Sequence, residues 1–383
     1  MNDAADRHGF ATRAIHAGTE PNPLNGAVNT PIYASSTFAQ DGVGGMRDGY
    51  EYARTGNPTR RSLEQQLAAL EGGAYGRAFS SGMAATDCAL RSLLRPGDHL
   101  VIPDDAYGGT FRLIDKVFSQ WGIDYSIAPV SDLDAVRAAV TERTKAIWIE
   151  TPTNPLLNVG DIAGIAEIAH AAGATFVVDN TFASPYLQQP LELGADVVLH
   201  STTKYLGGHS DVVGGVLVTD SEQLDADFAF LQNGAGGVPG PFDAYLTMRG
   251  AKTLAVRMEQ HCTNAEAVVD LLLGHPKVTH VLYPGLAEHP NHAVAARQMR
   301  RFGGMVSVRL GSRQAALDLC ARTELFTLAE SLGGIESLIE HPGAMTHAST
   351  AGSQLEVPED LVRLSVGIED TADLLADLEQ ALA

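Results

Sequence analysis

The sequence predicts an α/β protein with a large, mostly parallel sheet covered by helices and a second, smaller α/β domain. Between residues 62 and 218, short apolar segments alternate with amphipathic segments of helical period. After a glycine- and proline-rich run at 234–241, one long helical segment and shorter elements follow. A chain of 383 residues with 45% hydrophobic content can bury more than one core.

The alternation gives the order of the first domain. The helical segment 62–71 is amphipathic, and the one that starts at Gly82 stops before Pro96-Gly97. We expect helices at 62–71, 82–94, 110–121, 132–140 and 162–172. We expect strands at 77–80, 99–102, 123–127, 146–149, 175–178, 197–199 and 215–218. Strands joined by helices pair in parallel, so helices should cover both faces of the sheet.

The C-terminal part has a different pattern. A long helix is expected at 242–273, and strands at 305–310 and 362–366 should alternate with helices. The first fifty residues have few periodic signals. We therefore expect an N-terminal arm at 1–55 that contacts a neighbouring subunit, a large domain at 56–240, and a small domain at 241–383 that begins with the long helix.

Composition narrows the classes of partner and location. The formal charge of −20 disfavours nucleic acid and anionic membranes as partners. No signal core or membrane-length apolar segment is visible, which predicts a cytoplasmic protein. Cys88, Cys262 and Cys320 are odd in number and far apart, so buried thiols are expected rather than disulfides. His289 and His292 have no further ligand pair beside them, and no metal site is expected.

Lys204 is the residue around which the first domain is organised. It follows an apolar segment and three hydroxyl residues, and it precedes glycines that allow backbone to pack closely against a bound group. A lone lysine at a strand end is usually a surface cation. A partly buried amine has a lowered pKa, however, and becomes a nucleophile toward an aldehyde.

Four loops at predicted strand ends carry further polar residues, and in an open α/β sheet ligands bind at these ends. The turn 80–84 offers helix N–H groups to an anion, although a plain helix cap is the alternative. Tyr107 has the setting to stack on a planar ligand, and two prolines hold Asn154 in a rigid loop. Asp179 ends an apolar strand and needs a cation. A phosphorylated aromatic aldehyde with a protonated ring nitrogen, pyridoxal 5′-phosphate, meets all these requirements.

Several motifs also match a known family. They are Tyr52-Ala53-Arg54-Thr55-Gly56-Asn57-Pro58-Thr59, Ser80-Ser81-Gly82-Met83, Tyr107-Gly108-Gly109-Thr110, Glu150-Thr151-Pro152-Thr153-Asn154-Pro155, Asp179-Asn180-Thr181-Phe182, Ser201-Thr202-Thr203-Lys204-Tyr205 and Val362-Arg363-Leu364-Ser365-Val366-Gly367. The set resembles the Cys/Met-metabolism family of pyridoxal-phosphate enzymes, from about Thr12 to the C-terminus.

The resemblance implies the aspartate-aminotransferase type of fold (fold type I) and a homotetramer built as a dimer of dimers. It also implies a role for each matching residue. The cofactor phosphate is expected to be bound by Gly82, Met83, Ser201 and Thr203, and by Tyr52 and Arg54 of the neighbouring subunit. The cofactor ring is expected to stack on Tyr107, to pair through its nitrogen with Asp179 and to be bound covalently by Lys204. The substrate carboxylate is expected to be held by Asn154, Ser331 and Arg363.

The resemblance implies chemistry at Cγ of sulfur amino acids. Lys204 is expected to act as the base at Cα, and Tyr107 and Tyr52 are candidates for handling the leaving group's proton. An aminotransferase would share Lys204 and Asp179, and a non-catalytic regulator would lack the carboxylate grip of Arg363 and Asn154.

Finer features bear on the reaction. Glu330 matches an acidic residue of the cystathionine γ-enzymes. Gly109 stands where methionine γ-lyases usually have a cysteine, so methionine γ-lyase activity is a lesser alternative. Glu51 and Thr55 favour cleavage of cystathionine at Cγ, with cystathionine synthesis from an O-acylhomoserine and cysteine as the alternative. Arg112 has three possible roles: pairing with Glu330, holding a distal carboxylate, or lying as a solvated helix charge.

Overall fold

The structure is a computed structural model that describes residues 8–347, 352 and 355–383. The chain forms two compact units, Met1–Leu93 with Asp196–Ala255, and Leu94–Ala195 with Val256–Ala383. Residues 1–7 of the predicted arm lie outside the described residues, and the predicted division at residues 55 and 240 stays a prediction. Seven strands belong to a mixed sheet, as predicted, and a second sheet has five strands.

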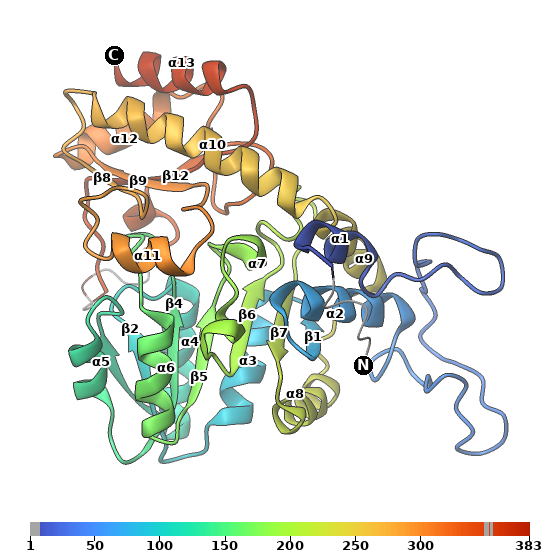
Figure 1. Ribbon diagram of the computed structural model, residues 1–383. Helices are drawn as coiled ribbons and strands as arrows, with labels where there is room; N and C mark the ends of the chain where they lie inside the picture. The colour runs from blue at the N-terminus through green and yellow to red at the C-terminus, as the bar shows by residue number, and fades with distance from the viewer. Residues whose placement is uncertain (1–7, 348–351, 353–354) are drawn as a thin grey trace. The chain divides into compact units, whose positions relative to one another are not determined.

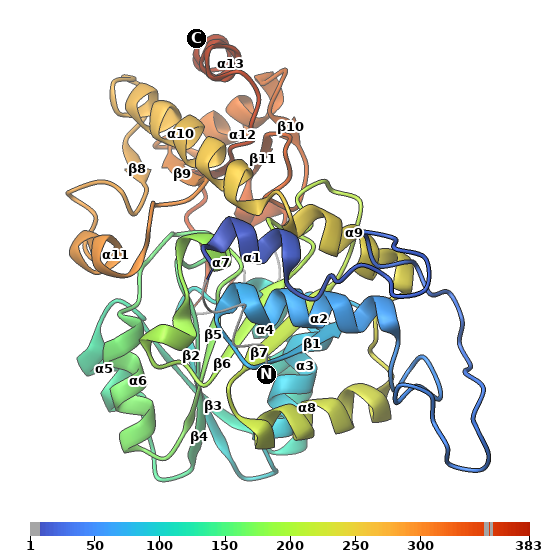
Figure 2. The ribbon, with the colours of Figure 1, turned by 45° about the vertical axis from the view of Figure 1, so that its right-hand side comes forward.

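The first unit contains three antiparallel strands in the order β1-β7-β6. Helix α2 packs on β1, β7, α1 and α9, whereas α3 and α8 pack on each other and on β1 and β7 (Figure 2). The elements of this unit are α1 (Phe10–His16), α2 (Pro58–Glu71), β1 (Tyr75–Phe79), α3 (Gly82–Leu93), β6 (Val197–Ser201), β7 (Gly215–Thr219), α8 (Glu222–Ala235) and α9 (Pro241–Ala251).

Helix α2 begins four residues before the predicted start. Asn57 caps it, because its side-chain oxygen accepts the N–H groups of Thr59 and Arg60, and Pro58 occupies the first helical turn. Gly72 ends the helix in the left-handed conformation, with φ of 78°. The capping residues thus explain both ends of the helix.

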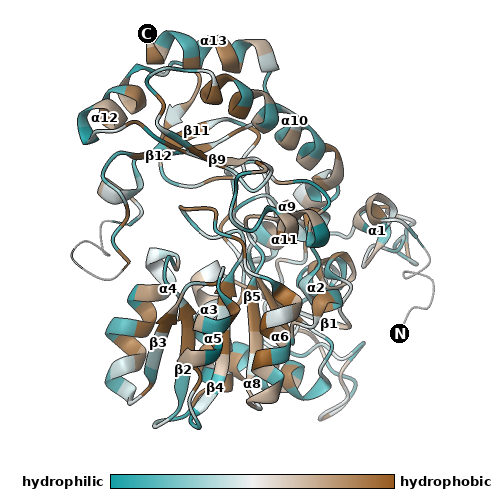
Figure 3. Ribbon diagram, turned by 60° about the vertical axis from the view of Figure 1, so that its left-hand side comes forward, coloured by the Kyte–Doolittle hydropathy of each residue, from teal (hydrophilic) through white to brown (hydrophobic). Residues whose placement is uncertain are grey.

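The second unit contains the parallel strands of the larger sheet in the order β5-β4-β2-β3. Strand β2 is buried throughout, and these strands are coloured as hydrophobic in Figure 3. The elements up to residue 195 are β2 (His99–Pro103), α4 (Gly108–Leu113), β3 (Asp124–Ala128), α5 (Leu133–Ala139), β4 (Thr144–Glu150), α6 (Ile162–Ala171), β5 (Thr175–Asp179) and α7 (Ser184–Leu187), with a 3-10 turn at Pro190–Leu193.

The predicted helix at 110–121 has an irregular second half. Helix α4 passes into a π-helical segment, Ile114–Phe118, and then into a 3-10 turn, Ser119–Trp121. Gly122, with φ of 78°, ends the turn. The element type is therefore confirmed, while its hydrogen-bond pattern changes along its length.

The C-terminal part of the second unit forms the five-stranded sheet, ordered β10-β11-β12-β9-β8. Strands β8, β9 and β12 of this sheet are labelled in Figure 1. All its strand pairs are antiparallel except β10 with β11. Its core draws apolar side chains from α10, α12, α13 and the strands. The elements are α10 (Leu254–Leu273), β8 (His280–Leu282), α11 (His292–Gln298), β9 (Met305–Arg309), α12 (Arg313–Arg322), β10 (Thr327–Leu328), β11 (Leu338–Glu340), β12 (Leu361–Ser365) and α13 (Thr371–Leu382), with a 3-10 turn at Pro342–Ala344.

The prediction of one continuous helix at 242–273 is wrong. The segment forms two helices, α9 and α10, separated at Lys252 and Thr253. Thr253 turns back on α9, because its N–H and its hydroxyl both donate to the carbonyl of Gly250, each at 3.1 Å. No proline marks this break in the sequence, so the break depends on contacts formed in the folded chain. No helix in the described part of the chain is long and apolar enough to cross a membrane.

Candidate active site

Lys204 lies in a tight turn that follows β6. Its N–H donates to the carbonyl of Ser201 at 3.2 Å, and its own carbonyl accepts the N–H of Gly208 at 2.8 Å. Thr202 between them is buried, and its N–H donates to Gly214 at 3.0 Å. Backbone hydrogen bonds on both sides therefore fix the position from which the lysine side chain starts.

The glycines after Lys204 serve the packing of the chain itself. A Cβ on Gly207 would lie 2.8 Å from the carbonyl oxygen of Thr202 and from Val212, and Gly208 has φ of 72°. A Cβ on Gly250 of α9 would collide with the carbonyl of Gly207. The expectation that these glycines make room for a bound group is thus replaced at Gly207 by close packing within the protein.

The start of α3 forms a cradle suited to a phosphate. Gly82 opens this twelve-residue helix, and Met83 follows in its first turn, where N–H groups have no partner within the helix. A Cβ on Gly82 would lie 3.0 Å from the Cβ of Ser201, at the end of β6. The hydroxyl of Thr203 accepts the N–H of Gly214 at 3.1 Å. Helix N–H groups, hydroxyls and a missing Cβ together fit the phosphate of the expected cofactor.

Tyr52, Arg54 and Glu51 lie on an exposed turn of the first unit. The ring of Tyr52 is 46% exposed, and the Arg54 guanidinium carbon lies 5.6 Å from the centroid of that ring. Exposure of all three side chains is compatible with the expected reach toward a neighbouring subunit, which stays a prediction.

Tyr107 lies directly before α4 in the second unit. Its N–H donates to both carboxyl oxygens of Glu150, at 2.9 and 3.1 Å. Burial raises the pKa of the Tyr107 hydroxyl, and the charges of Arg112, Glu330 and Arg363 also act on this pKa. The phenol therefore carries its proton at neutral pH.

Asp179 and Glu150 are opposite each other at the ends of the parallel strands β5 and β4. Asp179 accepts the N–H of Thr181 at 3.0 Å. Burial and then the charge of Asp179 raise the pKa of Glu150 well above its usual value. Two acidic side chains thus lie side by side at this edge of the sheet, which favours a cation beside them.

The loop that carries Tyr107 and the loop that carries Asn154 are joined by hydrogen bonds, and each loop donates to the other. Asp105 of the first loop accepts the hydroxyl proton of Thr153 and an amide proton of Asn158, the latter at 2.9 Å. Glu150, which begins the second loop, accepts the N–H of Tyr107. Burial raises the pKa of Asp105 to about 7.

Arg363, Asn154 and Ser331 are brought together in the second unit. Nη1 of Arg363 donates to the Asn154 side-chain oxygen, and Nη2 donates to the Ser331 carbonyl, both at 2.8 Å. Glu340 lies 3.1 Å from Nη1, and both side chains of this ion pair are almost fully buried. His347 donates from Nε2 to the Asn154 carbonyl at 3.0 Å. Ser331 has φ of 104°, a conformation that non-glycine residues rarely adopt and that is concentrated at functional sites.

The predicted specificity residues are distributed over both units. Arg112 and Glu330 belong to the second unit and have exposed side chains, whereas Glu51 belongs to the first. Among residues 8–347, 352 and 355–383, no ion pair joins Arg112 to Glu330. Their charges both act on Tyr107, so they lie within electrostatic reach of its hydroxyl.

Sequence reasoning missed three residues that support these groups. Glu150 was part of a recognised motif, and its place at a strand end beside Asp179 was a usable signal. Glu340 and His347 contact Arg363 and Asn154 through long-range packing, for which the sequence contains no local signal.

The cysteines match the prediction of buried thiols. Cys88, Cys262 and Cys320 are free and buried, and burial raises the pKa of each to about 12. Within the described residues, no group of three or more His, Cys, Asp or Glu side chains is placed to hold a metal ion.

The mixed sheet, the lysine turn and the helix-start cradle define a fold type I pyridoxal-phosphate enzyme. Residues 11–383 match the family described as Cys/Met metabolism PLP-dependent enzyme. The chain belongs to this family, as predicted.

Individual proteins of this family are similar to the chain over nearly its whole length. The chain is 74% identical to "Cystathionine gamma-synthase" of Mycobacterium bovis, over 98% of this chain and 97% of the relative. It is 52% identical to "Cystathionine beta-lyase" of Lactococcus lactis subsp. cremoris, over 97% and 98% of the two chains. The crystal structure of cystathionine gamma synthase from Xanthomonas oryzae pv. oryzae, in complex with aminoacrylate and cysteine, is 46% identical with a TM-score of 0.95, over 98% of each chain.

These relatives correct the preference between reactions. The sequence argument favoured cleavage of cystathionine at Cγ, whereas the 74% identity favours the alternative, cystathionine synthesis. That argument depended on Glu51 and Thr55, whose side chains are exposed. The motifs of the cofactor site are expected for both alternatives, so they do not separate the two reactions.

Proposed function

We propose that the protein is a cystathionine γ-synthase, which joins an O-acylhomoserine to cysteine. The 74% identity over nearly the whole chain to a relative of that name carries the proposal. In the reaction the Cγ–O bond of the acylhomoserine breaks and a Cγ–S bond forms. The acyloxy group leaves with one proton as the carboxylic acid, and the cysteine thiol gives up the proton that balances it.

The first unit supplies the proposed covalent and phosphate contacts. Lys204 binds the cofactor aldehyde through Nζ, and the N–H groups of Gly82 and Met83 bind its phosphate together with the hydroxyls of Ser201 and Thr203. The helix start beside Ser201 supports this assignment, because the N-terminus of a helix favours an anion.

The second unit supplies the proposed contacts to the ring. Tyr107 stacks on one face, and Asp179 binds the ring nitrogen as an anion. The place of Asp179 opposite Glu150 at the strand ends supports the second role, because two neighbouring carboxyl groups favour a cation there.

The substrate's α-carboxylate binds at Arg363, with Asn154 and Ser331 as its neighbours. The hydrogen bonds among these three residues support the proposal, because they fix the guanidinium before a substrate arrives. Glu340 balances the charge of Arg363 in the protein interior. The grip orients Cα of the substrate.

Residues on exposed segments are proposed to set specificity and assembly. Glu330 receives the distal amino group of cystathionine, and Arg112 or Glu51 contacts the far end of the substrate. Tyr52 and Arg54 extend to the cofactor phosphate of a neighbouring subunit in a homotetramer. Their exposure supports this assignment.

The proposed proton transfers use two side chains of this protein. Lys204, once the substrate amine has taken its place, removes the proton from Cα. Pyridoxal 5′-phosphate, when bound, supplies the aldehyde that joins the substrate amine and the ring that accepts the electron pair from Cα. Tyr107 is the proposed donor to the leaving acyloxy oxygen, because its phenol, whose pKa is raised, carries a proton at neutral pH. Tyr52 of a neighbouring subunit is the second candidate for this step.

Product identification tests the proposal. The purified holoenzyme is incubated with cysteine and either O-succinyl- or O-acetylhomoserine, and the products are identified by mass spectrometry. We expect cystathionine and the corresponding acid with at least one of the two substrates. Formation of 2-oxobutyrate and ammonia from cystathionine, without synthesis from either acylhomoserine, would assign the chain as a γ-lyase instead.

A further inference from the structure

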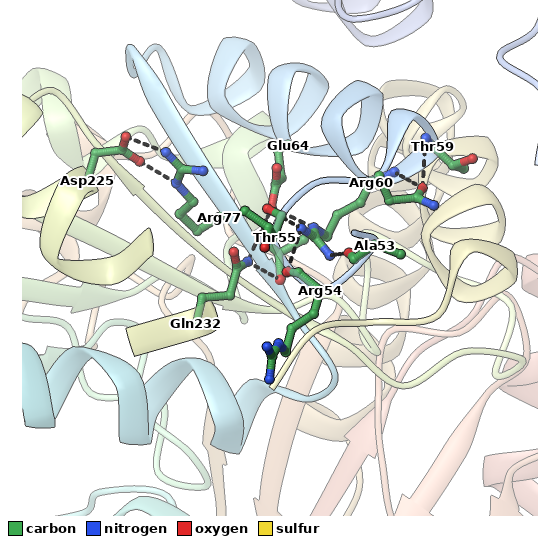
Figure 4. A network of polar contacts seen from close by, with 11 residues as sticks. Ala53, Arg54, Thr55, Thr59, Arg60, Glu64, Arg77, Asp225 and Gln232 are labelled. Atoms are coloured by element: carbon green, nitrogen blue, oxygen red, sulfur yellow. Dashed lines mark hydrogen bonds and ion pairs between the residues drawn. The ribbon is translucent and has the colours of Figure 1, made fainter. Parts of the chain in front are cut away.

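The turn that carries Arg54 has an unusual support on its inner side. Thr55 and Gly56 both donate their N–H groups to the carbonyl of Tyr52, each at 3.0 Å. The carbonyls of Ala53, Arg54 and Thr55 all accept hydrogen bonds from a single side chain, Arg60 (Figure 4).

Arg60 is buried in the first turn of α2, and its two terminal nitrogens donate to different carbonyls. Nη1 donates to Ala53 at 2.8 Å, and Nη2 donates to Arg54 at 3.1 Å and to Thr55 at 3.0 Å. Only 3% of its surface is exposed. Three consecutive carbonyls directed at one planar guanidinium define the backbone path of the turn, because moving any one of them breaks a buried hydrogen bond.

The buried charge of Arg60 is balanced one helical turn along α2. Its Nε lies 3.5 Å from Glu64 Oε1. The same Glu64 oxygen accepts the N–H of Ala78 in β1 at 2.9 Å and an amide proton of Gln232 in α8 at 3.3 Å. Gln232 also donates to the Ala78 carbonyl at 2.7 Å. The carboxyl group that faces Arg60 is therefore anchored to a strand and a second helix, as Figure 4 shows.

The backbone of Arg60 is fixed as firmly as its side chain. Asn57 accepts the N–H groups of Thr59 and Arg60, at 2.9 and 3.2 Å. Asn57 also donates to the carbonyl of Tyr33 at 2.8 Å, and the Thr59 hydroxyl donates to Pro31 at 2.8 Å. The start of α2 thus holds the segment 31–33 on one side and the turn 53–55 on the other.

We propose that Arg60 is a positioning residue for Arg54: by holding the carbonyls of residues 53–55, it sets the direction in which Arg54 presents its guanidinium to a cofactor phosphate. The assignment of Arg54 to the phosphate rests on the proposed function. The clamp on the turn is independent of that function, because it concerns only backbone contacts within the first unit.

Arg77 offers a matched control. It lies in β1, in the same region as Glu64, and makes a two-pronged ion pair with Asp225 at 2.6 Å. Among the described residues its hydrogen bonds and ion pairs do not include the turn, and Figure 4 shows it directed away from Arg54. Arg60→Lys and Arg77→Lys make the same chemical change. A lysine retains the charge but has one ammonium group, which cannot bond all three carbonyls as a planar guanidinium does.

The first measurement is limited trypsin digestion of the cofactor-free full-length protein, with cleavage at the Arg54–Thr55 bond followed by mass spectrometry. We expect cleavage at this bond about tenfold faster in Arg60→Lys than in the wild type, and less than twofold faster in Arg77→Lys, because loss of the clamp lets the turn open. Equal rates in the wild type and Arg60→Lys would overturn the proposal.

The second measurement is the dissociation constant for pyridoxal 5′-phosphate, obtained by titrating each apoprotein. Arg60→Lys should weaken binding about tenfold in the wild-type background and less than twofold in an Arg54→Ala background, because Arg60 acts through Arg54. An equal loss in both backgrounds would show a general structural role and would contradict the positioning role. Unchanged affinity in Arg54→Ala alone, with fast cleavage in Arg60→Lys, would reject the phosphate role of Arg54 and support the clamp.

Hydrogen exchange of the wild-type protein provides a readout that does not depend on a variant that folds. The amides of Thr55 and Gly56 should exchange more slowly than those of Asn25 and Val28, which are exposed and donate no backbone hydrogen bond among the described residues. Equal exchange in the two pairs of amides would show that the turn is not held, which would overturn the proposal.

Discussion

Removing the charge of Glu340 should destabilise the protein far more than removing the charge of an exposed carboxylate. Glu340 and Arg363 are opposite each other on the antiparallel strands β11 and β12, with Nη1 and Oε1 3.1 Å apart. At an effective dielectric constant of about 20, unit charges at this distance attract by roughly 5 kcal/mol. Glu340→Gln retains a neutral hydrogen bond worth about 1 kcal/mol, so we expect a loss of roughly 4 kcal/mol. This agrees with the roughly 3–5 kcal/mol typical of breaking a buried pair.

The assay is urea unfolding of the cofactor-free protein, followed by tryptophan fluorescence. Both tryptophans, Trp121 and the fully buried Trp148, belong to the unit that contains Glu340. The control is Asp124→Asn, which removes an exposed ion pair with Arg143 in the same unit and should cost about 0–1 kcal/mol. Midpoint and slope together give the free energy of unfolding.

A double substitution separates the ion pair from its surroundings. Glu340→Leu leaves the Arg363 charge buried without this anion, whereas Glu340→Leu with Arg363→Leu removes both charges. The double variant should therefore be less destabilised than the sum of the two single variants, by at least about 2 kcal/mol. Additive losses, or equal losses in Glu340→Gln and Asp124→Asn, would refute the reasoning.

Three further predictions concern the lysine, a buried histidine and the thiols. Borohydride reduction of the holoenzyme should leave the cofactor mass attached to the wild-type chain but not to Lys204→Ala, and attachment in that variant would reject Lys204. Burial lowers the pKa of His347 to about 4, so between pH 6.5 and 4 the unfolded chain binds a proton that the folded chain does not, and stability falls as the pH falls. In His347→Gln, the glutamine amide can still donate to the Asn154 carbonyl. From pH 6.5 to 4, the free energy of unfolding measured in urea should fall by about 3 kcal/mol less in this variant than in the wild type. An equal fall in the two proteins would contradict the prediction. Cys88, Cys262 and Cys320 should react with a thiol reagent only after unfolding, and fast reaction of the native protein would show that one is accessible.

The fold was largely predictable because its helices and strands have strong local signals. Apolar segments at β2 and β4 and the stop at Pro96-Gly97 predicted the element types, and the structure confirms them within a few residues. The break between α9 and α10 was not predictable, because it depends on how Thr253 bonds to Gly250 and on how closely Gly250 packs on Gly207. Neither contact changes the period of the sequence.

Residues of the candidate site were predictable where they stand in short motifs. Lys204 and Asn154 follow strands, Asp179 ends one, and all three have neighbours whose chemistry suggests a ligand. Glu340 and Arg60 were not predictable in the same way. Glu340 meets Arg363 only because two strands pair in one register, and Arg60 meets the turn 53–55 only because α2 folds back on the segment before it. Such partners become visible only when the chain is folded.

The most direct test of the central claim compares two reactions in one preparation. The kcat/KM for forming cystathionine from cysteine and the better of the two acylhomoserines is measured beside the kcat/KM for releasing 2-oxobutyrate from cystathionine. The proposed function predicts that synthesis is faster by at least about tenfold, or about 1.4 kcal/mol of transition-state free energy. A ratio that favours release of 2-oxobutyrate by the same factor would contradict it.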